Sequence, residues 1–439
     1  MNGVSSNKQP TAYTCFSTDI IHEGHLNIIR AAKQYGRVVV GVMSDRAMLS
    51  YYRFPTISFA ERMEMIRNLP DVDEVVIQDS VSYVDILRQI RPDYVVHSDR
   101  WQNAPWGKLR EELIDELARY GGELIEVPYT VNETVMKCDK KIREKLMMPE
   151  YRRKRLRQLL EIRPAVKAME AHNGLTGLIV EKTIVEHNGR FDQYDAMWVS
   201  SLCDSTAKGK PDIELVDLSS RLQTIEEIME VTTKPIIFDG DTGGLTEHFV
   251  YNVRTLERLG VSAVIIEDKI GLKKNSLFGT VAKQQQDSIE NFCNKLQTAK
   301  NSLLTDDFML IARVESLILE RGLSDALARA RAYVMAGADA IMIHSRQKTP
   351  MEIFAFCDAF RTEDKKTPLV VVPTTFNAVR EEEFTAHGIN IIIYANQLTR
   401  SAFPAMQKTA RDILLNGRAE ESEENLMSIR DIITLVEEI

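Results

Sequence analysis

Cysteine and aromatic residues are scarce in this chain of 439 residues, which has five Cys and 7% Phe, Trp and Tyr. The cysteines show no CxxC spacing, which argues against a disulfide framework or a zinc site and fits a reducing cytoplasm. No apolar run approaches the roughly 18 residues that a membrane span needs, and residues 1–15 contain no apolar signal core. We therefore expect a cytoplasmic protein that binds no membrane.

An excess of basic residues is also absent, because 64 Asp and Glu stand against 55 Lys and Arg, for a net charge of −9. A chain this acidic is a poor candidate for general nucleic-acid binding. Hydrophobic residues make up 44% and charged residues 27%, which are ordinary globular values and exclude extensive disorder. The length allows about two or three domains.

The first part of the chain alternates short apolar runs with amphipathic stretches. The expected strands are 11–16, 37–43, 74–77, 94–97 and 123–127, and the stretches at 25–35, 58–68, 81–90 and 107–120 have the periodicity of helices. Strands that alternate with helices in this way predict a parallel sheet with right-handed crossovers. Residues 11–146 are therefore expected to form one open α/β domain.

Basic residues concentrate between 137 and 157, where ten Lys and Arg stand against three acidic residues. We interpret most of this stretch as a solvated helical connector, with 147–160 as the linker between two domains. The alternative is that the first few basic side chains meet a nucleotide phosphate.

From about residue 165 onward, eight apolar runs recur at the spacing of βα units. Several are nearly continuous Val, Ile and Met, as expected for strands that are covered on both faces. Eight such units in roughly 250 residues predict a (β/α)8 barrel, in a second domain at 161–439. That domain is expected to end in a short amphipathic helix at 426–439. The runs are 165–171, 196–200, 235–239, 263–267, 309–314, 340–344, 369–373 and 389–395.

Polar or ionisable residues end nearly every one of these runs, where the active sites of such barrels lie. Asp239, Asp241 and Glu267 offer hard oxygen ligands on neighbouring strands, and a hydrated Mg2+ would relieve their mutual repulsion. Arg313 and His344 supply positive charge and donors opposite them, which suits an anionic, phosphorylated small substrate. The competing interpretation of the three carboxylates is a set of helix N-caps and salt bridges.

The segment EDKIGLKKNS, at 267–276, ends the fourth run and continues into a polar loop. Such a loop over a barrel mouth is a natural lid, although an ordinary surface loop would have the same composition. The segment resembles the E-D-K-x5-N-S signature of phosphoenolpyruvate mutases, in the isocitrate lyase superfamily. Further motifs resemble that family in the same order, namely MEAHNGL (169–175), DGDTGG (239–244), ARVES (312–316), AGADAIMIHS (336–345) and VVPTT (371–375).

The resemblance implies conversion of phosphoenolpyruvate to 3-phosphonopyruvate, with Mg2+ held by Asp239, Asp241 and Glu267, partly through water. Glycine is expected at position 201, where this chain has serine. The lid cysteine of isocitrate lyases is missing, and the lid asparagine that a phosphonopyruvate hydrolase would lack is present. By position, the resemblance assigns substrate binding to Ser200, Ser201, Leu202 and Ser276, and catalysis to Asp212, Lys273, Asn275, Arg313 and His344.

A second motif, DIIHEGHLNIIRAAKQYG at 19–36, places His22 and His25 at the entry to a helix. Two imidazoles there can donate to phosphates that also meet the helix N-terminus. Together with VVGVMSD (39–45), ISFAERMEMIRNL (57–69) and RPDYVVHSDRW (91–101), it resembles the H-x-G-H nucleotidyltransferases, especially cytidylyltransferases. This resemblance implies a Rossmann-like domain in which His22 and His25 bind the CTP phosphates. It also implies that Asp99 and Trp101 lie near the nucleoside.

Two departures from the cytidylyltransferase pattern leave open whether this domain is catalytic. Phe16-Ser17 stands where the family carries Gly-Thr, and CDKK at 138–141 stands where its Ser-Thr-Thr should be. The two resemblances together predict an enzyme that starts phosphonate synthesis and activates a later phosphonate, such as 2-aminoethyl- or 2-hydroxyethylphosphonate, with CTP. The alternative is an active mutase with a non-catalytic scaffold or nucleotide sensor in front. Because barrels of the mutase family exchange C-terminal helices, a homodimer or homotetramer is expected.

Overall fold

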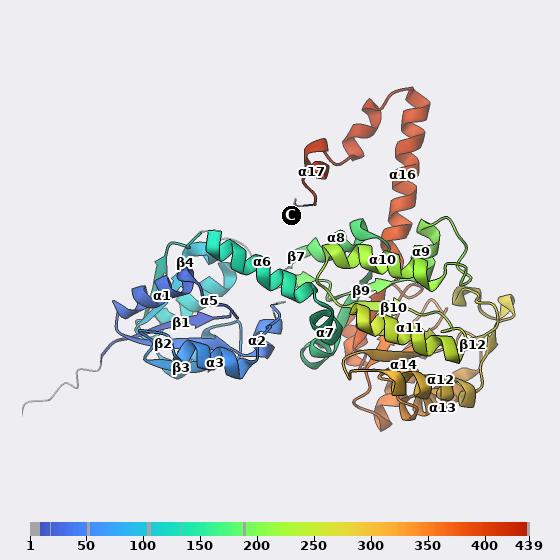
Figure 1. The fold of residues 1–439 in the computed structure, drawn as a ribbon, viewed down its shortest axis with the longest axis horizontal. Coiled ribbons are helices and arrows are strands. Elements are labelled where there is room, and N and C mark those ends of the chain that lie inside the picture. The colour runs from blue at the N-terminus through green and yellow to red at the C-terminus, as the bar shows by residue number, and fades with distance from the viewer. Residues whose placement is uncertain are drawn as a thin grey trace, which may run out of the picture.

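The computed structural model describes residues 9–436 apart from 18, 51–52, 103–106, 132 and 188–189. The chain forms two lobes, an open sheet with its helices (the first lobe) and a closed barrel, which two consecutive helices join (Figure 1). Among the described residues we find no helix with the length and apolarity that crossing a bilayer requires.

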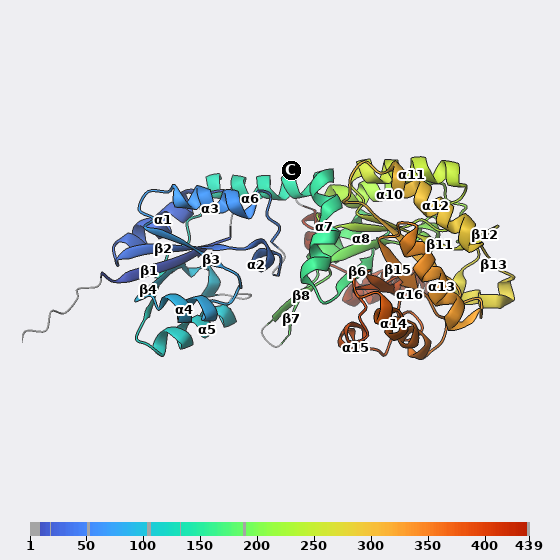
Figure 2. The same ribbon diagram turned by 90° about the horizontal axis from the view of Figure 1, so that it is seen from below.

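The first lobe is a parallel sheet with helices on both faces (Figure 2). Its strand order is β3-β2-β1-β4-β5, and each strand lies within one residue of its predicted bounds. Ile29 and Ile66 cover one face, whereas Leu87 and Leu117 cover the other. The short helix α2 was not predicted. The elements are β1 Thr11–Phe16, α1 Glu23–Lys33, β2 Arg37–Met43, α2 Asp45–Ser50, α3 Phe59–Arg67, β3 Glu74–Gln78, α4 Val84–Ile90, β4 Tyr94–Ser98, α5 Gly107–Ala118 and β5 Glu123–Val127.

Within the described residues the second lobe is a closed barrel of eight parallel strands. The strands follow one another around the barrel in chain order, and the last returns to the first through the pair Ile391–Val166. The (β/α)8 prediction is therefore confirmed. The strands are β6 Val166–Glu170, β9 Ala196–Val199, β10 Ile236–Asp239, β11 Ala263–Glu267, β14 Met309–Val314, β15 Ala340–Ile343, β16 Leu369–Val371 and β17 Ile391–Tyr394.

Helices surround this barrel, and two small antiparallel pairs decorate it. The pair β7 (Ile184–His187) and β8 (Arg190–Gln193) projects toward the first lobe in Figure 2. The pair β12 (Lys269–Ile270) and β13 (Gln285–Gln286) forms the base of the loop after β11. The helices are α8 Gly174–Lys182, α9 Ser201–Ala207, α10 Leu218–Val231, α11 Thr246–Leu259, α12 Ile289–Ser302, α13 Gly322–Met335, α14 Met351–Glu363 and α15 Glu381–Ala386.

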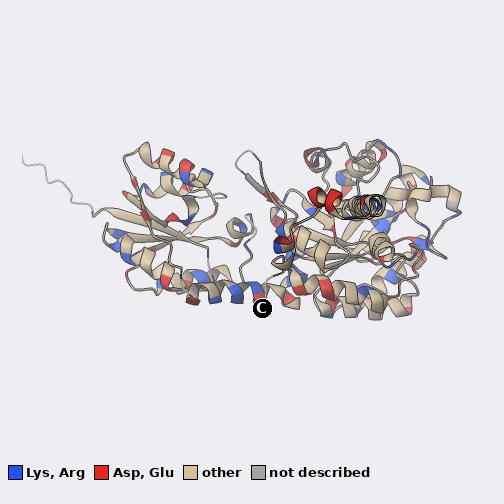
Figure 3. Ribbon diagram, turned by 90° about the horizontal axis from the view of Figure 1, so that it is seen from above, with Lys and Arg blue, Asp and Glu red and all other residues tan. Residues whose placement is uncertain are grey.

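Two helices, α6 (Glu133–Met147) and α7 (Pro149–Ile162), run from the first lobe to the barrel. Figure 3 shows basic positions recurring along the helices between the lobes. Leu156 and Leu159 of α7 pack into the cluster of side chains that fills the barrel interior. The helix therefore closes the end of the barrel at which the strands begin.

The interpretation of this basic stretch as a solvated connector is wrong for α7. Arg152 and Arg155 are 0% and 1% exposed. Arg152 donates to the carbonyl oxygens of Lys234, at 2.9 Å, and Met229, at 3.1 Å. Burial lowers the pKa of Arg155 to about 9. These guanidinium groups replace water as donors to carbonyls that precede a barrel strand, which is why charged residues can be buried here.

The C-terminal segment leaves the barrel as α16 (Gln397–Asn416), a helix with no buried residue that stands away from the rest of the chain in Figure 1. It turns back through η3 (Glu420–Asn425) to α17 (Ile429–Ile433). The predicted terminal helix is therefore shorter than 426–439, of which residues 437–439 lie outside the described part. Large apolar side chains are exposed along this arm, namely Phe403, Met406, Leu414, Leu415, Ile429 and Ile433.

We predict that Arg152→Met lowers the free energy of unfolding by about 3 kcal/mol, because several buried carbonyls lose their donor at once. Urea unfolding followed by circular dichroism measures the loss. The matched control is Lys154→Met on the same helix, where the partly exposed ammonium lies 4.7 Å from the centroid of the Tyr151 ring. That change should cost less than about 1 kcal/mol. Equal losses would mean that the buried guanidinium contributes no more to the free energy of unfolding than an exposed ammonium does.

Candidate active sites

A cavity of about 70 Å³ lies at the C-terminal ends of the barrel strands, the edge at which the sequence predicted an active site. Trp198, Met342 and Val372 give it apolar walls. Asp241 is not among its lining residues and reaches the site through an ion pair with Lys273. The predicted residues that do line it are Ser200, Ser201, Leu202, Asp212, Asp239, Glu267, Lys273, Asn275, Ser276, Arg313 and His344.

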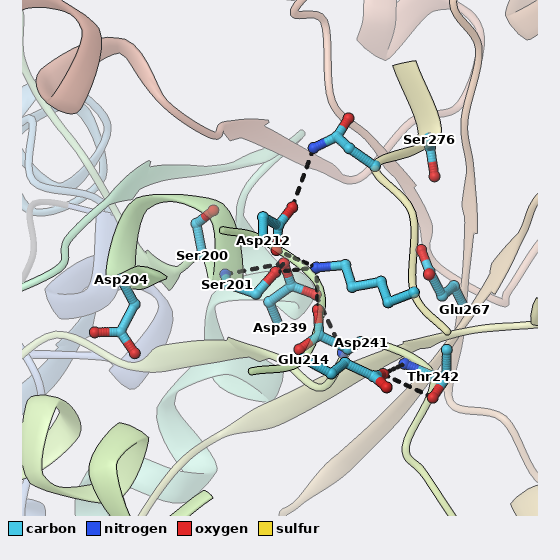
Figure 4. A network of polar contacts seen from close by, with 12 residues as sticks. Ser200, Ser201, Asp204, Asp212, Glu214, Asp239, Asp241, Thr242, Glu267 and Ser276 are labelled. Carbon is cyan, nitrogen blue, oxygen red and sulfur yellow. Dashed lines mark hydrogen bonds and ion pairs between the residues drawn. The ribbon is translucent and has the colours of Figure 1, made fainter. Parts of the chain in front are cut away.

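The loop after β10 gathers two of the carboxylates. Asp239 ends the strand, and Asp241 follows with φ at +53°, in the left-handed region that side chains other than glycine rarely adopt. Strain of this kind persists where the surroundings fix it, often at functional sites. Figure 4 shows Asp239 and Asp241 beside Asp212 and Ser201, at the centre of a network of polar contacts.

Lys273 is the cation at the centre of this network. Its Nζ donates to Ser201 Oγ at 2.6 Å, to Asp212 Oδ1 at 2.5 Å, and to Asp241. Burial opposes its charge, but Asp241, Asp239 and other carboxylates raise the pKa of Lys273 above its ordinary value. The side chain is therefore an ammonium that compensates the surrounding carboxylates.

The three carboxylates differ in their electrostatics. Burial would raise the pKa of Asp239, but the Lys273 ammonium and two arginines lower it below its ordinary value. Burial and the neighbouring Asp239 raise the pKa of Asp241, and burial raises that of Glu267 to about 7. In the part of the chain that is described, no three His, Cys, Asp or Glu side chains form a complete metal-ligand group.

Arg221 lies beside these carboxylates but was not among the site residues predicted from the sequence. Arg221, on α10, donates to the carbonyl oxygen of Asp239 at 2.5 Å and to Asp241 Oδ2 at 3.2 Å. Its guanidinium lies 4.1 Å from the centroid of the Phe238 ring and is buried. An arginine in the middle of an amphipathic helix carries no sequence signal that distinguishes it from a solvated one.

The opposite wall of the cavity is a donor cluster. Arg313 Nη2 lies 2.6 Å from Ser276 Oγ and 2.8 Å from His344 Nδ1, and Arg313 Nε donates to Glu315 at 2.5 Å. Burial, followed by Arg313, lowers the pKa of His344, so its ring is neutral near pH 7. Because Arg313 can only donate, we assign Nδ1 as the acceptor and Nε2 as the protonated nitrogen. Glu315, which had no predicted role, orients the arginine.

The loop from β12 to β13, residues 269–286, lies over the cavity and is called the lid below. Lys273, Asn275 and Ser276 all line the cavity, so this is no ordinary surface loop. Asn275 Nδ2 donates to Asp212 Oδ2 at 3.1 Å. At its base, Lys269 Nζ donates to Ser276 Oγ at 2.9 Å.

The first lobe holds a larger cavity, of about 490 Å³, which His22 and His25 line. His22 is the N-cap of α1 and accepts from the Gly24 N–H through Nδ1, at 3.2 Å. His25 Nδ1 accepts in turn from the His22 N–H at 3.3 Å. Both rings therefore use Nδ1 as an acceptor, which assigns their protons to Nε2. Burial, followed by His22 and Arg53, lowers the pKa of His25 to about 3 and keeps it neutral.

Of the other two residues predicted for the nucleotide site, Trp101 lies at the cavity and Asp99 does not. Trp101 lines the cavity, where its ring stacks on His97 with centroids 3.7 Å apart. Asp99 is not among the lining residues, and its Oδ1 accepts from the Tyr129 N–H at 2.9 Å. Phe16 also lines the cavity and packs its ring against the His25 ring.

Cationic and apolar groups complete that cavity. Arg53 and Arg100 are among its lining residues, and no Asp or Glu of the described residues is. Segment 138–141, which departs from the cytidylyltransferase pattern, lies on α6, and its residues Lys140 and Lys141 are exposed. The next residue, Ile142, lines the cavity. A site of this composition suits an anionic ligand with an aromatic portion.

Comparison with known proteins agrees with both lobes. A family model described as "Phosphoenolpyruvate phosphomutase" matches residues 156–414, and one described as "Cytidylyltransferase-like" matches residues 13–157. A phosphoenolpyruvate phosphomutase of Tetrahymena pyriformis is 34% identical over 285 residues, which are 65% of this chain and 88% of that protein.

A phosphonopyruvate hydrolase of Variovorax sp. is 36% identical over 282 residues, 64% of this chain and 93% of that protein. A solved structure of a phosphonopyruvate hydrolase in complex with oxalate and Mg++ matches with a TM-score of 0.58 and 34% identity. It covers 65% of this chain and 94% of that one. The chain belongs to the phosphoenolpyruvate phosphomutase family, and it carries an N-terminal cytidylyltransferase-like domain.

Proposed function

We propose that the barrel isomerises phosphoenolpyruvate to 3-phosphonopyruvate by intramolecular phosphoryl transfer. The observation that carries this proposal is the lid, which holds Lys273 and Asn275 against Asp212 over a small buried cavity. The O–P bond of the substrate breaks, and the phosphoryl group passes to C3 of the pyruvate enolate. Such a transfer needs positioning and charge rather than covalent help. It also needs water to be excluded, because water would give pyruvate and phosphate.

The carboxylates fit a Mg2+ ion. Their oxygens are hard donors, Asp239 and Glu267 both face the cavity, and the buried Glu267 Oε1 is paired only with the Lys269 ammonium, at 3.1 Å, among the described residues. No complete set of three ligands is preformed among the described residues, which suits an ion that keeps several of its waters. Asp239, Asp241 and Glu267 would hold it, partly through water. The ion would supply charge that stabilises the enolate.

The other groups would act on the two ends of the substrate. Arg313 and His344 present a guanidinium and a neutral N–H donor to the phosphoryl group, and Asn275 adds an amide from the lid. The turn at Ser200, Ser201 and Leu202 would hold the carboxylate and carbonyl end. The ammonium of Lys273 would balance the charge of the enolate.

A hydrolase is the competing function, because the same cavity with water admitted would cleave phosphonopyruvate. The 36% identity to the Variovorax hydrolase makes this alternative concrete. The lid asparagine favours the mutase, because the family resemblance implies that hydrolases lack it. In this chain the Asn275 amide reaches Asp212 and so ties the lid to the barrel.

We predict that Asn275→Ala lowers turnover about tenfold, the effect of losing one hydrogen bond. The variant should also release more pyruvate and phosphate per phosphonopyruvate formed, because the lid closes less tightly. Phosphorus NMR of the products measures this partition. Asn294→Ala, an exposed asparagine on α12, is the control and should match the wild type. An unchanged rate and partition in Asn275→Ala would exclude this role for the lid asparagine.

We predict that Asp239→Ala abolishes turnover, by a factor of at least about 100, while the protein stays folded. It should also weaken Mn2+ binding in titration calorimetry, because a buried hard ligand is gone. The control is Asp306→Ala, an exposed aspartate ahead of β14, which should change neither measurement. Normal metal binding by Asp239→Ala would remove Asp239 from the proposed metal site.

For the first lobe we propose binding of CTP and cytidylylation of a phosphonate. A phosphonate oxygen would attack the α-phosphorus of CTP, the bond to pyrophosphate would break, and a CMP-phosphonate would form. The Nε2–H groups of His22 and His25, together with Arg53, would stabilise the phosphates. The acceptor would be a compound such as 2-aminoethyl- or 2-hydroxyethylphosphonate.

A non-catalytic nucleotide sensor or scaffold is the second candidate for this lobe. Two observations favour it: the Phe16 ring occupies space against His25, and Lys140 and Lys141 are exposed on α6. Under this alternative CTP would bind, but no pyrophosphate would be released with any phosphonate.

We predict that His25→Ala weakens CTP binding about tenfold or more and removes pyrophosphate release, because a donor to the phosphates is lost. The interconversion of phosphoenolpyruvate and phosphonopyruvate should remain near the wild-type rate. Labelled CTP with a panel of phosphonates tests the first lobe, and a coupled assay tests the barrel. Lys33→Ala, near the other end of α1, is the control. A parallel loss of mutase activity in a folded variant would contradict the independence of the two sites.

We further propose a homodimer or homotetramer in which the arm of α16 and α17 packs on a second copy. The arm exposes Leu414 and Leu415 by 86% and 84%, and exposed apolar patches of this kind mark protein–protein interfaces. Asn396, at the base of the arm, lines the barrel cavity. The helix proposed to form the subunit interface therefore begins directly after a residue that lines the cavity.

A further inference from the structure

The hydroxyl of Ser201 sits between the lid and the strand ends of the barrel. Ser201 is 4% exposed and begins α9. Its Oγ donates to Asp239 Oδ2 at 2.8 Å and accepts from Lys273 Nζ at 2.6 Å. Its backbone N–H donates to the same Asp239 oxygen at 3.1 Å. The side chain thus connects a lid residue to a strand-end carboxylate (Figure 4).

The direction of these hydrogen bonds is fixed by charge. Lys273 is an ammonium, so it can only donate, and the hydroxyl must accept from it. The single hydroxyl proton then goes to Asp239, which is an ionised acceptor. Because both its proton and a lone pair are engaged, Ser201 is not poised as a nucleophile. Its contacts assign it a positioning role instead.

A capping role does not account for this side chain. The N-cap of α9 is Ser200, whose own hydroxyl accepts from the Cys203 N–H at 3.3 Å. Ser201 follows the cap, and its hydroxyl points away from the helix toward Asp239 and Lys273. The helix therefore has its cap without this hydroxyl.

Two donors of Ser201 fix the orientation of the Asp239 carboxylate. Both the N–H and the O–H of Ser201 donate to Oδ2, whereas Oδ1 accepts a longer hydrogen bond, from the Asp241 N–H at 3.3 Å. A carboxylate held through one oxygen keeps its rotamer and offers the other oxygen to the cavity. The same hydroxyl anchors the lid through Lys273.

We propose that the Ser201 hydroxyl is a positioning group that latches the closed lid through Lys273 and selects the Asp239 oxygen that faces the substrate. This inference deepens the proposed barrel function and rests on it for its catalytic consequence. Lys273 also binds Asp212 and Asp241, so the latch adds a third point of attachment, on the β9–α9 turn. A glycine at this position would keep the backbone contact to Asp239 and lose the latch.

Limited trypsin digestion tests the latch without any need for turnover. The lid presents Lys273-Lys274, and cleavage there requires the lid to open. With Mg2+ and oxalate as the closing ligands, we expect Ser201→Ala to be cleaved about tenfold faster than the wild type, the effect of losing one charge-assisted hydrogen bond. Ser205→Ala is the matched control, since Ser205 lies on the same helix, is 4% exposed and is not among the cavity-lining residues.

The product partition of the same variants tests the catalytic consequence. Ser201→Ala should release more pyruvate and phosphate relative to phosphonopyruvate, with a larger effect on kcat than on KM, whereas Ser205→Ala should match the wild type. Ser201→Gly repeats the test if the alanine variant fails to fold, and it should behave in the same way. Wild-type cleavage rates and partition in a folded Ser201 variant would overturn the latch.

The two arms separate failure of the latch from failure of the proposed function. If the wild type converts no phosphoenolpyruvate, the mutase proposal fails, and the cleavage rates still decide whether Ser201 holds the lid. If the wild type is active and Ser201→Ala is cleaved faster but partitions normally, the latch exists without the proposed effect on water exclusion. That outcome would overturn the catalytic half of the inference.

Discussion

The crowding of carboxylates at one rim of the barrel is the constraint on which the rest of the site depends. The side chains of four acidic residues are brought together here and are almost fully buried, so their charges must be compensated. They are Asp212, Asp239, Asp241 and Glu267. Arg221 and Arg313 supply part of the compensation from the barrel itself. Lys273 supplies another part from the lid, so the position of the lid affects how far the rim is neutralised. Displacing Lys273 from this rim would expose the carboxylates to water and ligands and remove one of their counter-charges.

Buried charged residues also lie at the opposite end of the barrel, where they bind backbone carbonyls rather than carboxylates. There α7 inserts apolar side chains into the barrel, and Arg152 and Arg155 bind backbone carbonyls. The first lobe docks at this end, where the Phe54 ring lies 4.3 Å from the Arg155 guanidinium and the Thr56 carbonyl accepts from Tyr151. Stability and attachment are thus concentrated at the end where the strands begin, and the candidate chemistry at the end where they finish.

The sequence predicted the strands and the cavity lining better than it predicted the buried charges. Apolar runs and their polar ends are local signals, so the barrel and residues such as Asp239 and His344 could be located. The buried positions of Arg152 and Arg221 could not be predicted, because an arginine in a helix is expected to face solvent unless its acceptors are known. Those acceptors, Lys234 and Asp239, lie on separate segments of the chain and meet the arginines only in the fold.

Independence of the two cavities follows from how they are built. The described lining of the first-lobe cavity runs from Cys15 to Ile142 and that of the barrel cavity from Trp198 to Asn396, with no residue in common. The first is larger and edged by neutral imidazoles and arginines, whereas the second is small and holds its own counter-charge. The contacts that Phe54 and Thr56 make with α7 lie at the barrel end opposite the candidate site, away from the lid. Fusion therefore keeps two separate cavities in one chain without requiring that either site feed the other.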